Sequence, residues 1–156
     1  FGSSGTFSNA LSPVQAATVL KAFEIVKTDE GRNLRAALMK NVLYLRGELA
    51  RIGMEVIGNP SAIVSAKVGD EALARMVSQK LPALGVVANL VEFPAVAKGS
   101  ARFRLQVMAN HTKSHIDDLI GRLYSALDEV KPDYQAYRAA IAEKTALETH
   151  PAWRTA

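Results

Sequence analysis

The stretch from Ala101 to Ala109 alternates strictly in side-chain character. Every second residue is apolar: Ala101, Phe103, Leu105, Val107 and Ala109. A period of two predicts a strand with one face in the core. The positions between them begin with Arg102 and Arg104, which such a strand would place about 7 Å apart on its other face.

Apolar residues spaced by three and four predict helices over about residues 13–27, 28–52, 70–84, 114–130 and 134–147. The first begins with a complete signal: Ser12 as N-cap, Pro13 at the first helical position and Gln15 placed for a capping box. We expect a break near Lys131 and Pro132, because proline removes a helical hydrogen bond.

Shorter apolar runs at 54–58, 61–69 and 86–93 predict further strands. Long helices around a few short strands indicate an α+β fold, with a small, mainly antiparallel sheet and helices packed on one face. No segment is left to cover the second face of that sheet. We expect that face to be bare and apolar, and to meet a ligand or another domain.

Composition excludes several classes of protein. The chain has 156 residues, of which 49% are hydrophobic and 22% charged, as in one ordinary globular domain. It has no cysteine for a disulfide and no apolar run of the ~20 residues that cross a bilayer. The net charge of +4 is dispersed, so we expect no nucleic-acid partner. Without an apolar run of that length we expect no membrane partner, and we expect a cytoplasmic location.

The chain begins Phe-Gly-Ser-Ser-Gly, with no methionine and no apolar signal segment. We therefore expect a piece of a longer protein or a processed product.

Few residues suggest chemistry by motif. There is no phosphate loop of Walker or Rossmann spacing and no GxSxG elbow. His111 and His115 lie four apart without an HExxH motif, so we interpret them as cap or solvated residues, not as metal ligands. Asp117 and Asp118 follow, where acidic residues complement a helix dipole.

The arginine pair admits two interpretations from pattern alone. Arg102 and Arg104 either lie on a wet or ion-paired sheet face, or bind an anion. Arginine is the residue preferred for bidentate carboxylate binding. Phe103 would point away from both arginines, which counts against a nucleic-acid-binding sheet with stacking aromatics.

Three segments together resemble one known family. They are "TFSNALSPVQAATVLKAFEIV", "LPALGVVANLVEFPAVAKGSARFRLQVMANHT" and "IDDLIGRL". Over residues 6–128 they are similar to the C-terminal part of the pyridoxal-phosphate-dependent α-oxoamine synthases. That family includes glycine C-acetyltransferase, to which the resemblance is nearest, 8-amino-7-oxononanoate synthase, 5-aminolevulinate synthase and serine palmitoyltransferase.

The resemblance implies the small C-terminal domain of a fold type I enzyme that condenses an amino acid with an acyl-CoA. It implies that Arg104 binds the amino-acid carboxylate, and that Arg102 serves packing or a structural ion pair. Ser8 and Asn9 match residues that reach the phosphate of pyridoxal 5'-phosphate in the partner subunit of a homodimer. The implied domains are a lead-in at 1–12, the small domain at 13–130 and a helical extension at 131–156.

The resemblance also implies what the chain lacks. The cofactor lysine belongs to the family's large domain. Lys21, Lys40 and Lys67 lie in predicted helices or strands with no matching glycine context, so we expect no catalytic residue here and an inactive isolated chain. Ala95 and Ala97 depart from residues common in the family and leave the amino acid and the acyl-CoA open. The alternative is an independent α+β regulatory or binding module without catalysis.

Overall fold

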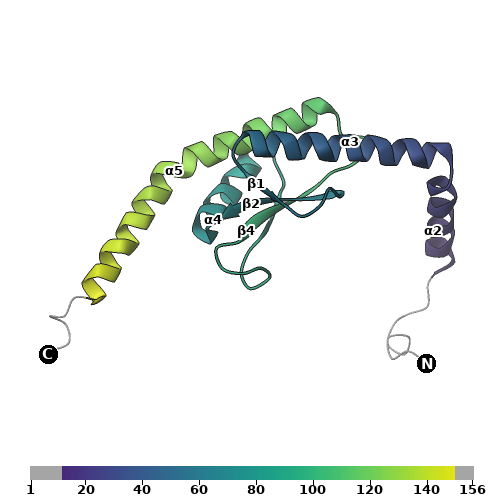
Figure 1. Cartoon of the computed structure of the whole chain (residues 1–156). Helices are drawn as coiled ribbons and strands as arrows, with labels where there is room; N and C mark the ends of the chain where they lie inside the picture. Colours follow the sequence, from purple (N-terminus) through teal and green to yellow (C-terminus); the bar gives the residue numbers. More distant parts are fainter. Residues whose placement is uncertain (1–11, 150–156) are drawn as a thin grey trace, which may run out of the picture. The chain divides into compact units, whose positions relative to one another are not determined.

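The structure is a computed structural model that describes residues 12–149 (Figure 1). The predicted cofactor residues Ser8 and Asn9 lie outside the described residues. The chain divides after Ala37 into two compact units. No helix among the described residues is long and apolar enough to cross a membrane.

The first unit contains helix α2 (Pro13–Val26) and the start of helix α3 (Asp29–Arg51). The predicted capping box is confirmed: Gln15 N donates to Ser12 Oγ and Ser12 N to Gln15 Oε1, both at 3.2 Å. The turn into α3 needs a glycine, because a Cβ on Gly31 would collide with the backbone of Ile25 and Val26.

The second unit is built on a four-stranded antiparallel sheet in the order β1-β2-β4-β3. The strands are β1 (Glu55–Ile57), β2 (Ile63–Gly69), β3 (Asn89–Val91) and β4 (Ala101–Gln106). The predicted fold class is therefore confirmed. The run at 86–93 pairs only over Asn89–Val91, so the predicted strand there is too long.

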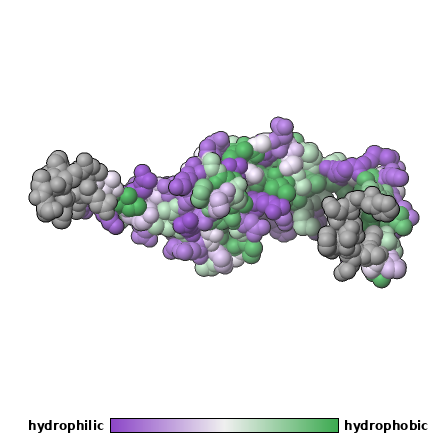
Figure 2. Space-filling model, turned by 90° about the horizontal axis from the view of Figure 1, so that it is seen from below, coloured by the Kyte–Doolittle hydropathy of each residue, from purple (hydrophilic) through white to green (hydrophobic). Residues whose placement is uncertain are grey.

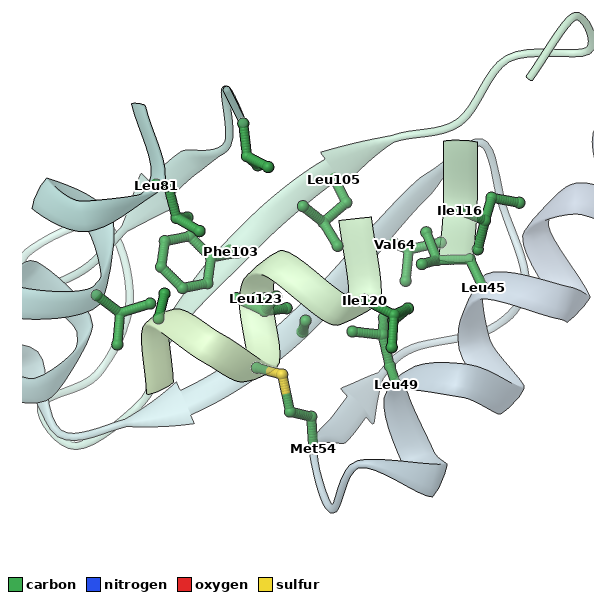
Figure 3. Close-up of a cluster of buried hydrophobic side chains, with 14 of the residues drawn as sticks. Leu45, Leu49, Met54, Val64, Leu81, Phe103, Leu105, Ile116, Ile120 and Leu123 are labelled. Carbon is green, nitrogen blue, oxygen red and sulfur yellow. The ribbon is translucent and has the colours of Figure 1, made fainter. Parts of the chain in front are cut away.

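Helices cover one face of this sheet (Figure 1). They are the second half of α3, α4 (Glu71–Lys80) with its short 3₁₀ continuation η1 (Leu81–Leu84), and α5 (Lys113–Thr149). Their apolar stripes meet the inner face of the sheet in one core, shown in Figure 3. The largest side chains in that core are Phe103, Leu45, Leu49, Leu81 and Leu123.

The prediction of a helix break near Lys131 and Pro132 is wrong. Helix α5 continues through Pro132 without interruption to Thr149. The helix is held on both sides of the proline: Val130 is buried in the core, and Arg138 lies 3.5 Å from Asp70 at the start of α4. These contacts maintain the helix across the hydrogen bond that proline cannot make.

The uncovered face of the sheet differs from expectation as well. Strand pairing places these residues on it: Glu55, Ile57, Ile63, Ser65, Lys67, Asn89, Val91, Arg102, Arg104 and Gln106. We call this surface the open face. Only a minority of the residues on the open face are aliphatic, so the expectation of an apolar face is wrong. A polar face points to a ligand more than to a hydrophobic partner.

We predict that Asp70 stabilises the domain as the N-cap of α4. Its Oδ1 accepts hydrogen bonds from the backbone of Ala72 at 2.8 Å and of Leu73 at 3.1 Å. Asp70→Ala should lower the free energy of unfolding by about 1 kcal/mol. Asp70→Asn keeps a capping oxygen and should lose much less. Urea unfolding measures both variants; equal losses would mean that the ion pair with Arg138, not the cap, stabilises the domain.

We predict an acid-sensitive contact between α3 and α5. Asp117 accepts a hydrogen bond from Lys113 at 2.6 Å and from the Tyr44 hydroxyl at 2.5 Å, and these hydrogen bonds lower the pKa of Asp117. Stability from this contact is complete above about pH 4, the ordinary pKa of an aspartate, and is lost as the pH falls through the lowered pKa. Asp117→Asn should therefore be less stable than wild type at pH 7 and approach it at pH 2. A constant difference across that range would contradict the assignment.

Candidate functional site

Arg104 occupies the middle of the open face. Its strand β4 pairs on both sides, with Ser65 of β2 and Asn89 of β3 directly opposite Arg104. Its side chain is exposed and makes no hydrogen bond or ion pair with any other side chain or backbone group among residues 12–145. A cation on a strand held from both sides, with no charge partner of its own, is arranged to bind an anion.

The inner face of β4 fixes this orientation. Ala101 and Phe103 are fully buried and Leu105 nearly so. A slip of one residue in register would move all three into solvent and bring both arginines into the core. The apolar alternation of the sequence therefore directs the guanidinium of Arg104 outward.

Arg102 lies on the same face in a different environment. It is half-buried, and its Nε donates to the backbone oxygen of Ser100 at 3.1 Å. Within the described part of the chain it forms no ion pair, so of the two expected roles, packing and a structural ion pair, its half-buried position and backbone contact favour packing. The residue directly opposite is another cation, Lys67, which pairs with Glu55 at 2.7 Å.

Sequence reasoning did not connect Lys67 with the arginines. Lys67 lies thirty-five positions from Arg102, and only the register of β2 against β4 makes them neighbours. The available signal was the alternation of β2, in which Val64 and Ala66 are buried and Ser65 and Lys67 are not. Figure 2 views the molecule from below relative to Figure 1, and hydrophilic and hydrophobic residues are interspersed on the surface in view.

His111 and His115 are engaged by backbone hydrogen bonds. The rings of His111 and His115 are perpendicular, with centroids 6.2 Å apart. Each Nδ1 accepts a backbone N–H at 3.3 Å, from Met108 and Thr112 respectively. No group of three metal-binding side chains exists among residues 12–149. The contact of His115 agrees with a cap role at the start of α5, whereas His111 closes the turn that precedes the helix.

A cavity also lies between α3 and α5. It has a volume of about 640 Å³ and is lined by residues that include Tyr44, Glu48, Arg51, Lys113 and Asp117. Its charges already neutralise one another, since Arg51 pairs with Glu48 at 2.7 Å and Lys113 with Asp117. It therefore offers less to a charged ligand than the open face does.

The open face suits a carboxylate and does not suit a pyridoxal ring. A cofactor aldehyde needs a lysine amine, and the lysine on this face, Lys67, is engaged by Glu55. No other described residue of the open face can form an imine. The residues present thus fit the anionic end of a substrate.

Comparison with known proteins places this geometry in a family. The aminotransferase class I and II family matches residues 1–123. A putative 8-amino-7-oxononanoate synthase of Desulfovibrio desulfuricans is 37% identical over 121 residues, which cover 78% of this chain and 31% of the relative. The erythroid-specific, mitochondrial 5-aminolevulinate synthase of Delphinapterus leucas is 31% identical over 125 residues. These residues cover 80% of this chain and 22% of that relative.

Among solved structures, serine palmitoyltransferase from S. paucimobilis, with PLP and myriocin bound, superposes with a TM-score of 0.72 at 28% identity. The match covers 80% of this chain and 31% of that one. The chain thus spans about a quarter to a third of the length of these relatives. All three are pyridoxal-phosphate-dependent α-oxoamine synthases, so the resemblance identified from the motifs is confirmed. The chain belongs to the aminotransferase class I and II family.

Proposed function

We propose that the chain is the small C-terminal domain of a pyridoxal-phosphate-dependent acyltransferase that condenses an amino acid with an acyl-CoA. Within that enzyme, Arg104 binds the carboxylate of the amino acid. The family match and the α-oxoamine synthases among the relatives support the reaction class. The observation that carries the role of Arg104 is its exposed, unpaired guanidinium on the central part of the open face.

A guanidinium suits this role for geometric reasons. Its planar fork donates two parallel hydrogen bonds to the two carboxylate oxygens, which fixes the direction of the bound amino acid as well as its position. Because β4 is paired on both sides, the base of the side chain does not move when the carboxylate binds.

The chemistry at the amino acid's α-carbon lies with the cofactor, which supplies an electron sink for the developing carbanion when bound. In our proposal the lysine that holds it belongs to a large domain outside this chain, and the isolated chain is inactive. Ser8 and Asn9 reach the cofactor phosphate of the partner subunit in a cytoplasmic homodimer. The proposed domains are a lead-in at 1–12, the small domain at 13–130 and a helical extension at 131–156.

Arg104→Ala in the full-length enzyme should weaken amino-acid binding by about 30- to 1,000-fold, since the loss of a bidentate charge-assisted contact costs ~2–4 kcal/mol. Arg104→Lys should recover part of that affinity as a point charge. The measurement is an amino-acid titration followed by the absorbance of the bound cofactor. Binding of the cofactor itself should be unchanged.

The matched control is Gln106→Ala, which truncates an exposed polar side chain on the same face of the same strand. It should bind the amino acid as wild type does. Arg102→Ala should reduce stability more than amino-acid affinity, since its contact is with the backbone of Ser100. Wild-type affinity in Arg104→Ala, or an equal defect in Gln106→Ala, would refute the assignment.

A further inference from the structure

The open face carries more positive charge than its own carboxylates neutralise. Lys67, Arg102 and Arg104 lie on it, and strand pairing places one carboxylate there, Glu55. Glu55 is bound to Lys67, so neither arginine has an acidic partner within the described part of the chain. The excess is concentrated on two adjacent strands, β2 and β4.

Lys67 and Arg102 are directly opposed across those strands. Like charges at directly opposed positions destabilise a sheet, because their side chains start only about 5 Å apart. Both side chains are half-buried, which reduces the screening of their repulsion by water. The Glu55 carboxylate offsets part of this repulsion, but Glu55, Lys67 and Arg102 together remain positively charged, so a bound anion would lower the remaining cost.

Each of the two side chains keeps hydrogen-bond donors that its own contact does not use. The Nε–H of Arg102 donates to the backbone oxygen of Ser100. This hydrogen bond holds the guanidinium in place and leaves its Nη donors available. Lys67 donates to Glu55, and its ammonium has two further N–H groups. An anion between them would therefore receive charge-assisted hydrogen bonds without displacing Glu55.

We propose that Lys67 and Arg102 form a second anion site on the open face, beside the site of Arg104. Its ligand is a phosphate or carboxylate group that belongs to a molecule other than the amino acid, and the acyl donor is the co-substrate that carries such groups. The assignment to the acyl donor rests on the proposed function. The evidence for the anion site itself is the charge of Lys67 and Arg102 and the register of β2 against β4.

Binding is tested first on the chain itself with inorganic phosphate. Phosphate should shift the NMR resonances of the Arg102 side chain and raise the melting temperature above that in sodium chloride of equal ionic strength, which controls for general screening. Lys67→Met and Arg102→Met should each weaken phosphate binding about tenfold, as expected for one lost charge-assisted contact.

The matched control is Lys98→Met. Lys98 is an exposed lysine outside the sheet, with its ammonium over the ring of Phe93, and its loss should leave phosphate affinity unchanged. A parallel titration with acetate identifies the group: tighter binding of phosphate indicates a phosphate ligand, and tighter binding of acetate indicates a carboxylate. Equal effects of phosphate and chloride, or equal losses in Lys98→Met and Lys67→Met, would overturn the proposal.

The full-length enzyme then tests the acyl donor. Lys67→Met should raise the KM for acyl-CoA about tenfold and leave amino-acid affinity unchanged, the reverse of the pattern expected for Arg104→Ala. An unchanged KM for acyl-CoA together with lost phosphate binding would refute the acyl donor as the ligand and leave the role of Arg104 untouched. An unchanged amino-acid affinity in Arg104→Ala would instead refute the proposed function.

Discussion

Burial of one side of β4 is the constraint on which the rest of the structure depends. Phe103 is fully enclosed by the helices and by neighbouring strands, and Ala101 and Leu105 extend that contact along the strand (Figure 3). Truncating a buried phenylalanine to alanine typically costs ~3–5 kcal/mol, a large fraction of the stability of a domain this size. The alternation of side chains then leaves Arg102 and Arg104 no position other than the open face. The burial that packs the core therefore also places the two arginines on the open face.

The same constraint explains what could be predicted from the sequence. Local signals sufficed for α2, whose cap at Ser12 is complete within four residues, and for β4, whose period of two is unbroken. Local signals failed where contacts between residues far apart in the sequence determine the secondary structure. Pro132 is a helix breaker by local criteria, yet α5 continues through it because Val130 is buried and Arg138 lies beside Asp70. Strand β3 is shorter than its apolar run because only Asn89–Val91 find a partner on β4.

The same distinction between local and long-range signals applies to the candidate site. Arg104 could be predicted, because its exposure follows from alternation within its own strand. The environment of Arg102 could not, since Lys67 becomes its neighbour only through the antiparallel register of β2 and β4. The polar character of the whole open face depends on the register of four strands, although β4 alone already places Arg102, Arg104 and Gln106 on it. The role of Ser8 and Asn9 remains a prediction from the motif, because both lie outside the described residues.

The central claim is that the open face binds the anionic end of an amino acid through Arg104. The most direct measurement is a crystal structure of the full-length enzyme with the amino acid bound. We expect both carboxylate oxygens to lie about 2.7–2.9 Å from guanidinium nitrogens of Arg104, the range of charge-assisted hydrogen bonds. A carboxylate held by another residue, with Arg104 facing solvent, would contradict the claim.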